Sequence, residues 1–370
     1  MTNFAEIKQG LRRQDPDELE GLVFQFIDEG GTFDEVLRQM LYLAATEDFH
    51  SDQLPGILIL DAVRDLMTLY ESGDSDSWPL IVTAIQGFSR LSLKEFDDEV
   101  VKLGPEDMSA TAFVMDFQEY VLAGERENAL HEASKLLLLM DNPFYLVEIL
   151  IEIASRVPRD NGMALILGGV VLKQLDFVGS ARYRHLIWQL TDYITRLEMG
   201  MQHSVEESST EPDYPFQEQY RSLLHADDTD VWPLVLLTHA QIIWDEVRMK
   251  EVRIRQNLST VLRELLPELR YSEVSEEFPN RDVALDQIQE SLMRERWEET
   301  KESIPAYLHG GGDPGELFRV MTDAFISSIQ GEGLSQVIHW NGYRTAIASL
   351  RAPGRYQAFL RAAEYLLEGP

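Results

Sequence analysis

The residues of this chain with the widest chemical range are its eight histidines, because imidazole can bind a metal, move protons near neutral pH or hydrogen-bond in a core. His239 and His339 are flanked by apolar residues on helical segments, and we expect both to be at least partly buried. A buried imidazole needs a hydrogen-bond partner, an acid or a metal, since an unsatisfied polar group in a core costs about 1–3 kcal/mol. Taken singly, each is more simply a hydrogen-bonded core residue than a metal ligand.

Several histidines together favour a metal centre more strongly than one does. Histidine is a common ligand of iron, zinc and copper, and repeated helical units bring equivalent positions to a shared axis or groove. The candidate metal ligands are His50, His239 and His339, with His185 and His131 as further candidates. We expect an apolar substrate pocket beside them, lined by Trp188, Trp244, Trp340 and Tyr343.

Other catalytic constellations are poorly supported. The single Glu-x-x-His motif, Glu47 to His50, is half of what a di-iron bundle needs. The acids Asp227, Asp228 and Asp230 precede Trp232 without a second metal motif, so we interpret them as loop and cap residues rather than the magnesium ligands of an all-α terpene synthase. The sequence has no phosphate-binding glycine loop, no nucleotide cofactor motif and no cysteine, so thiolate chemistry is excluded.

Charge limits the classes of partner. The 370 residues include 64 acidic and 32 basic side chains, which gives a formal net charge of -32. Such a chain repels phosphate backbones and anionic lipids, so nucleic-acid and membrane roles are disfavoured. The N-terminal residues are polar and acidic, and the longest apolar run, 163–172, is shorter than a bilayer requires, so we expect a cytoplasmic protein.

Helical signals recur along the whole chain. Apolar residues follow the spacing of one-faced helices, for example over 37–44 and 136–140, whereas period-two alternation is scarce. Asp15-Pro16 predicts a helix start, with an acceptor at the cap and proline in the first turn. One uninterrupted pattern from Val231 to Leu269 predicts either a long helix or two helices joined end to end.

Internal repeats indicate a duplicated helical module. The segment 30–40, which begins Gly-Gly and continues with a cap and a glutamate, returns at 311–321, with a third copy from 140 to 150. Trp78-Pro79 likewise matches Trp232-Pro233. The repeating unit is expected to be two helices joined by a tight turn, or these two followed by a third. We therefore predict an all-α fold of repeated helical hairpins, either an α-solenoid or a multi-helix bundle, with little or no β-sheet.

The polar stretch 201–215 lacks apolar rhythm and is the expected linker. It would divide the chain into N-terminal repeats over 1–200 and C-terminal repeats over 216–370, unless the two form one continuous domain.

Short segments resemble one known family. The runs 44–50 and 60–66, together with Thr238-His239-Ala240, resemble the questin oxidase-like proteins. The resemblance implies a helical fold in which a non-haem iron is held by several histidines and oxidises polycyclic aromatic substrates with dioxygen. It further implies His50, His239 and His339 as ligands, with His131 or His185 as a fourth.

Two functions follow as hypotheses. The first is a metal-dependent oxidoreductase or oxygenase, with non-haem iron on histidines and a small aromatic or apolar substrate. The alternative is a non-catalytic helical-repeat scaffold that binds a protein partner.

Overall fold

The computed structural model describes residues 4–47, 54–70, 75–93, 113–140, 142–156, 160–179, 182–197, 213–225, 231–266, 283–328, 336–351 and 354–368. Every regular element in these ranges is a helix, and extended pairing there is limited to one bridge between Glu47 and Leu93. The all-α fold expected from the apolar spacing is confirmed. The segments 201–212 and 226–230, with His50, lie outside the described residues.

The described helices form three units of five, with three further described helices between the second and third units. The first unit is α1 (Phe4–Arg13), α2 (Pro16–Asp28), α3 (Phe33–Ala44), α4 (Gly56–Met67) and α5 (Trp78–Ser89). The second is α7 (Val114–Ala123), α8 (Arg126–Leu139), α9 (Phe144–Ala154), α10 (Met163–Val178) and α11 (Tyr183–Arg196). The third is α15 (Leu285–Met293), α16 (Trp297–His309), α17 (Pro314–Ser328), α18 (Gln336–Ser349) and α19 (Gly354–Glu368). Between them lie α12 (Phe216–His225), α13 (Trp232–Glu246) and α14 (Glu251–Leu265). Short 3₁₀ turns, Ser75–Ser77 and Asp160–Gly162, precede α5 and α10.

The units share their packing order and their turns. In each, the first helix packs on the second, the second on the fifth and the fourth on the fifth. The turn between the first two helices has a left-handed residue at the same position in all three units: Gln14 (φ 55°), Gly124 (φ 73°) and Glu295 (φ 54°). A left-handed residue commonly ends an α-helix, so it is the equal position of this turn, together with the shared packing order, that supports duplication. The repeating unit is therefore larger than the two or three helices expected from sequence.

The double-glycine repeats end their helices in the same way. The amide of Gly31 donates to the Phe26 carbonyl and that of Gly312 to the Tyr307 carbonyl, each at 2.9 Å. A Cβ at either glycine would lie 2.3 Å from the ring of that same aromatic residue. These bonds satisfy the last carbonyls of each helix while the aromatic ring covers the turn. The predicted correspondence of these two segments is confirmed.

Helix starts also follow the sequence signals. Asp15 Oδ1 accepts hydrogen bonds from the amides of Asp17 and Glu18, each at 3.1 Å, so the predicted cap is confirmed. Trp78-Pro79 and Trp232-Pro233 both begin helices, α5 and α13. Their helices do not occupy equivalent places, because α5 closes the first unit whereas α13 lies between units. The similarity of these two segments therefore reflects helix-start chemistry more than equivalent position.

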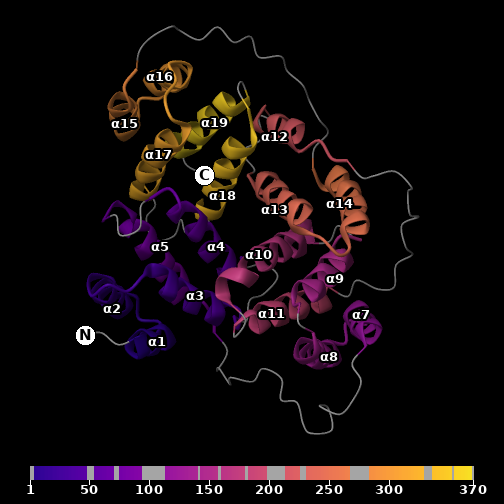
Figure 1. The fold of residues 1–370 in the computed structure, drawn as a ribbon. Helices are drawn as coiled ribbons and strands as arrows, with labels where there is room; N and C mark the ends of the chain where they lie inside the picture. Colours follow the sequence, from indigo (N-terminus) through magenta and orange to yellow (C-terminus); the bar gives the residue numbers. More distant parts are fainter. Residues whose placement is uncertain are drawn as a thin grey trace.

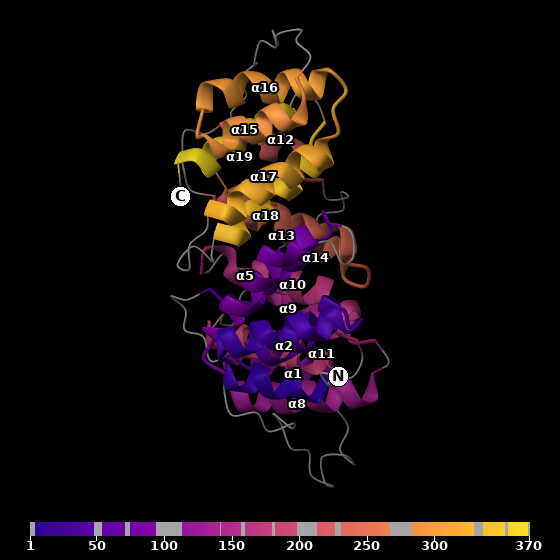
Figure 2. The same ribbon diagram turned by 90° about the vertical axis from the view of Figure 1, so that its left-hand side faces the viewer.

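The fourth helices of the three units meet at the centre of the molecule. In Figure 1 the first unit (indigo), the second (magenta) and the third (orange to yellow) meet at their fourth helices, α4, α10 and α18. Helix α13 completes this central group. Figure 2 shows the molecule elongated, with α16 at one end and α8 at the other. Helices from residues 1–200 and 216–370 therefore pack directly on each other, α10 along α13 and α4 along α18.

Helix α10 is the apolar axis of this arrangement. A Cβ at Gly169 would lie 3.0 Å from the carbonyl oxygen of His239, so the glycine allows α13 to approach closely. Among the described residues, Asp160–Val178 is the one helix long and apolar enough to cross a membrane, and 78% of that stretch is buried inside the protein. The central position of α10 accounts for its composition, because all its sides meet other helices.

Candidate functional site

A buried cluster of charged and polar side chains lies where the central helices meet. Lys173 Nζ on α10 lies 3.0 Å from Asp61 Oδ1 and 2.5 Å from Asp65 Oδ2, both on α4. Asn341 Nδ2 on α18 donates to Asp65 Oδ2 at 2.9 Å, and the Gln174 side chain donates to Asp61. Residues from all three fourth helices therefore join a single network, so equivalent helices do converge polar residues at the centre.

Electrostatics keep the members of this cluster charged. Burial alone would raise the pKa of Asp61, but the Lys173 ammonium and hydrogen bonds hold that pKa well below its usual range. Burial alone would lower the pKa of Lys173, but the two aspartates raise it above its usual value. The lysine is thus a protonated ion-pair partner rather than an amine nucleophile, since nucleophilic lysines need a depressed pKa. The cluster can fix the relative placement of three units.

His239 lies beside this cluster on α13. It is 5% exposed, and its Nδ1 lies 2.8 Å from the Val235 carbonyl oxygen, so Nδ1 carries the hydrogen and donates it. Its Nε2 faces Asp61, with 3.9 Å between Nε2 and Oδ2. The imidazole therefore meets a carbonyl and a carboxylate, the two partners expected of a buried histidine.

The other predicted histidines have different surroundings. His339 on α18 is partly buried, with Nδ1 3.2 Å from the Tyr365 hydroxyl oxygen. His185 on α11 is buried edge-on between the rings of Tyr42 and Trp188, with ring centroids 4.4 and 4.8 Å away. His131 lies on α8 and is partly exposed. Among the described residues no group of three or more His, Asp or Glu is placed to hold a metal ion, and with His50 outside them the iron hypothesis stays a prediction.

The aromatic residues predicted to line a pocket pack mainly with local partners. Trp340 stacks between Phe318 and Phe325 and donates from Nε1 to Thr322 Oγ1 at 3.0 Å, and its ring centroid lies 6.3 Å from that of Tyr343. Two of the predicted residues are thus brought together. Trp188 Nε1 donates to Ser134 Oγ at 3.0 Å, and Trp244 packs edge-on against Phe216. The common substrate pocket remains a prediction.

The turn between α13 and α14 is clamped by a buried carboxylate from α9. Glu148 on α9 is buried, and its carboxylate accepts three consecutive backbone amides, from Arg248 at 3.0 Å, Met249 at 2.9 Å and Lys250 at 2.8 Å. Val247 is extended (ψ 138°) and ends α13. The two helices consequently form a hairpin, and the end-to-end arrangement expected over 231–269 is wrong. The turn holds because Glu148 satisfies amides that a continuing helix would have bonded internally.

A second carboxylate one helical turn further along α9 extends the clamp. Glu152 is fully buried and accepts hydrogen bonds from Lys250 Nζ at 2.6 Å, Arg156 Nη2 at 2.6 Å and Arg253 Nη1 at 3.1 Å. Burial alone would raise its pKa, but these cations lower that pKa below its usual value. Glu152 therefore stays ionised and holds the Lys250 and Arg253 side chains of the turn against α9.

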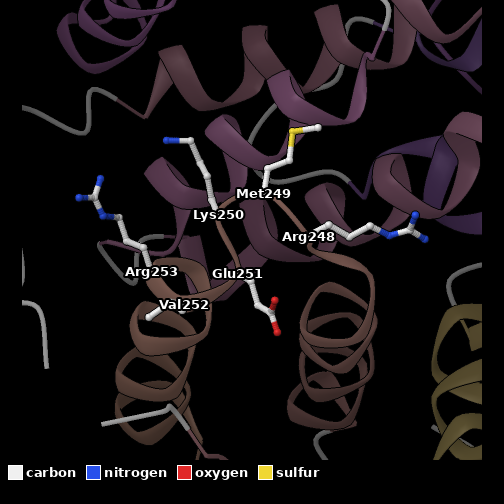
Figure 3. A pocket seen from close by; sticks show the side chains of 6 residues that line it. All are labelled: Arg248, Met249, Lys250, Glu251, Val252 and Arg253. Carbon is white, nitrogen blue, oxygen red and sulfur yellow. The ribbon is translucent and has the colours of Figure 1, made fainter. Parts of the chain in front are cut away.

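The clamped turn borders a shallow hollow of about 390 Å³, lined by residues 248–253 (Figure 3). Met249 and Val252 are 53% and 57% exposed there, and the Arg248 side chain is 84% exposed. Figure 3 shows Lys250 and Arg253 directed to one side of the turn and Arg248 to the other. Sequence reasoning missed this site, although four basic residues within 248–255 of so acidic a chain were a visible signal.

A second surface feature is the end of the α7–α8 hairpin, where α7 begins and α8 ends. The exposed fractions are 53% for Phe113, 70% for Met115, 42% for Leu138 and 65% for Leu139. The Phe113 amide donates to Glu132 Oε1 at 2.9 Å, which ties this end of α7 to α8. Half of the large apolar side chains found exposed among the described residues belong to this one hairpin end.

The fold and these features define an all-α protein of repeated five-helix units with an ionic centre. Comparison of the chain with protein-family models, curated proteins and solved structures gave no match.

Proposed function

We propose that the chain is a helical-repeat scaffold that binds a protein partner through the open end of the α7–α8 hairpin. The observation that carries this proposal is a comparison between the chain's own units. Because the hairpins α1–α2, α7–α8 and α15–α16 share spacing and turn geometry, each position of one has a counterpart in the other two. A residue type that is missing from the equivalent positions of the other two units is not required for the hairpin to fold.

The second unit differs from the other two at this end. Its exposed apolar residues Met115, Leu138 and Leu139 have as counterparts Ala5, Asp28 and Glu29 in the first unit and Asp286, His309 and Gly310 in the third, all of them exposed. Two units thus fold with small or polar residues where the second has large apolar ones. Exposed apolar groups that the fold does not require are characteristic of binding surfaces.

The chemistry of the partner follows from the surroundings. The exposed apolar residues are flanked by Glu119 on α7, in a chain with a net charge of -32. A partner segment with an apolar face and basic flanks would complement this surface, whereas anionic lipid and nucleic acid would be repelled. On this proposal, buried His239 and the charged centre stabilise the fold of the scaffold. The oxygenase is a separate hypothesis.

The counterpart residues supply the test. The variant Met115→Asp/Leu138→Asp/Leu139→Glu introduces acids that occur at the same fold positions in the first or third unit, so it is expected to stay folded by circular dichroism. We expect a partner captured from native extract by the wild type, identified and purified, to lose binding to this variant by about 100-fold or more in calorimetric titration.

The matched control is Met293→Asp, an exposed apolar residue at 69% exposure on another unit, which should bind the partner as the wild type does. Equal binding of the purified partner to the wild type and to the triple variant would contradict the proposal, as would the absence of any specific partner.

A further inference from the structure

We infer that the exposed ring pair of Phe24 and Trp78 in the first unit is a second binding surface, which takes an arginine side chain of a basic peptide segment. This inference does not depend on the apolar hairpin end or on the proposed scaffold function. It rests on the geometry of the two rings, on the carboxylates beside them and on a comparison with the other two units.

The two rings meet at a right angle on the outside of the molecule. Phe24 on α2 and Trp78 at the start of α5 have ring centroids 5.2 Å apart and an interplanar angle of 87°. Phe24 is 59% exposed and Trp78 is partly buried. Figure 1 shows α2 at the edge of the molecule, with α5 beside it. An edge-to-face pair leaves a corner between two aromatic faces, and a cation in that corner is attracted to both.

The fold does not require an aromatic residue at position 24. Counted from the left-handed residue of each hairpin, the counterparts of Phe24 are Ser134 in the second unit and Pro305 in the third, and both are buried. In the second unit Trp188 of the fifth helix packs on Ser134 and donates to its hydroxyl at 3.0 Å. In the first unit Trp78 of the fifth helix meets the larger Phe24 edge-on and leaves it more than half exposed. Two units therefore bury a smaller residue where the first exposes a ring.

The helix that carries Phe24 is acidic around the ring. Helix α2 contains four acidic side chains and no basic one. Glu20 and Asp28 lie four residues before and four residues after Phe24, so they share its face of the helix. Among the described residues neither of these carboxylates is in an ion pair, whereas Glu18 pairs with Arg13 at 2.7 Å. Two carboxylates without a cation therefore flank the exposed ring.

The Trp78 end of the surface is also acidic. Arg319 on α17 is the cation of the ion pairs found there among the described residues, and it is shared by two acids. Its Nη1 lies 3.9 Å from Asp76 Oδ2 and its Nη2 lies 3.0 Å from Glu316 Oε2. Helix α5 itself has no charged residue. The corner between the rings is thus bordered by a net negative charge, which favours a cationic side chain there over a neutral or anionic one.

An arginine side chain matches both features of this surface. Its planar guanidinium stacks on aromatic faces and forms paired hydrogen bonds with carboxylates. The net charge of -32 attracts any basic peptide from a distance, but that attraction does not depend on the rings. The ring pair therefore supplies the local selectivity, and its contribution can be measured by removing a ring while the charge of the protein is kept constant.

The test is a fluorescence anisotropy titration of the full-length protein with a labelled synthetic peptide of two arginines among serines and glycines. Phe24→Ser is expected to weaken binding by about three- to tenfold, because it removes one ring and leaves the net charge unchanged. Serine occupies this position in the second unit, and circular dichroism checks that the variant is folded. Phe24→Leu keeps an apolar side chain on α2 and should show a similar loss, which separates cation binding by the ring from simple apolar contact.

Matched variants on the third unit complete the design. Asp28→Asn should weaken binding by about two- to fivefold, whereas Glu302→Gln, which removes an exposed acid on α16, should leave the affinity unchanged. Met293→Ser removes an exposed apolar side chain and should also have no effect. A peptide with citrulline in place of arginine should bind at least about tenfold more weakly.

Several results would each overturn the inference. These are the absence of saturable binding to the wild type, equal affinity of the wild type and either Phe24 variant, and a loss in Met293→Ser as large as that in Phe24→Ser. Equally tight binding of the citrulline peptide, or of a peptide with leucine in place of arginine, would show that the surface does not select a cation.

Discussion

The ammonium of Lys173 on α10 lies 3.0 Å from the Asp61 carboxylate on α4, and this contact joins the first two repeat units at the centre of the protein. Lys173→Met should lower the free energy of unfolding by about 3–5 kcal/mol, because it leaves Asp61 and Asp65 buried without their cation. Urea unfolding at neutral pH followed by circular dichroism measures this loss.

The double variant Asp61→Asn/Lys173→Met provides the control, since removing both members of a buried pair costs less than removing one. We expect it to recover part of the stability lost in Lys173→Met. A loss below about 1 kcal/mol in the single variant would show that solvent compensates the aspartates and that the pair does not hold the units together.

A second ionisable group should give the stability a pH dependence of its own. Burial raises the pKa of Glu47 to about 7, against the lowering effect of a hydrogen bond from the Gly56 amide, which lies 2.7 Å from Oε2. The ordinary pKa of the glutamate side chain, 4.5, applies in the unfolded chain. Between pH 4.5 and about 7, Glu47 is therefore protonated in the folded protein and ionised in the unfolded chain. The contribution of protonated Glu47 to the free energy of unfolding is therefore complete below pH 4.5. It is lost as the pH rises to about 7, by up to about 3 kcal/mol.

Glu47→Gln removes this titration. The variant should gain stability relative to the wild type as the pH is raised from 4.5 to 8, as measured by thermal unfolding across that range. Glu119→Gln on an exposed surface is the control and should track the wild type. If Glu47→Gln and the wild type change in parallel with pH, Glu47 titrates at its ordinary pKa.

Local signals in the sequence were sufficient for much of the fold. The Asp15-Pro16 cap and the Gly30 and Gly311 turns were predictable because their partners lie within a few residues. The burial of His239 was predictable from its apolar neighbours.

Long-range partners explain what the sequence did not reveal. Glu148 accepts the amides that follow Val247 from a hundred residues away in the sequence, so the end of α13 was not visible in the pattern over 231–269. The partners of Lys173 are similarly distant, and a lysine after an apolar run indicates only that something must neutralise it. Repeat copies were visible in the double glycines, but the five-helix unit emerged only from packing.

Adjacent glycines on α10 offer a sharp test of how closely α13 packs. A Cβ at Gly169 would meet the backbone carbonyl of His239 at 3.0 Å, whereas a Cβ at Gly168 would meet the Ile151 side chain at 2.9 Å. Backbone cannot yield without moving α13, but a side chain can change rotamer. Gly169→Ala should therefore destabilise by about 1–3 kcal/mol, and Gly168→Ala by less than about 1 kcal/mol, because alanine favours the helix. Equal effects in urea unfolding would show that α13 adjusts freely.

Metal content distinguishes a scaffold from an oxygenase. Because no group of three or more His, Asp or Glu among the described residues is placed to hold a metal ion, we expect the untagged protein to purify with far less than one iron per chain. His239→Ala should cost about 2–4 kcal/mol of stability and leave the metal content unchanged. Stoichiometric iron that is lost in His239→Ala and His339→Ala would instead favour the oxygenase hypothesis.

Glu148 provides the most direct test of whether a buried acid organises the α13–α14 surface. Glu148→Ala removes the acceptor of three backbone amides, so we expect about 2–3 kcal/mol lower stability and faster hydrogen exchange at Met249 and Lys250. Glu246→Ala removes an exposed acid beside the same turn and should leave exchange unchanged. Unaltered exchange in Glu148→Ala would mean that the two helices, and not the carboxylate, hold the turn.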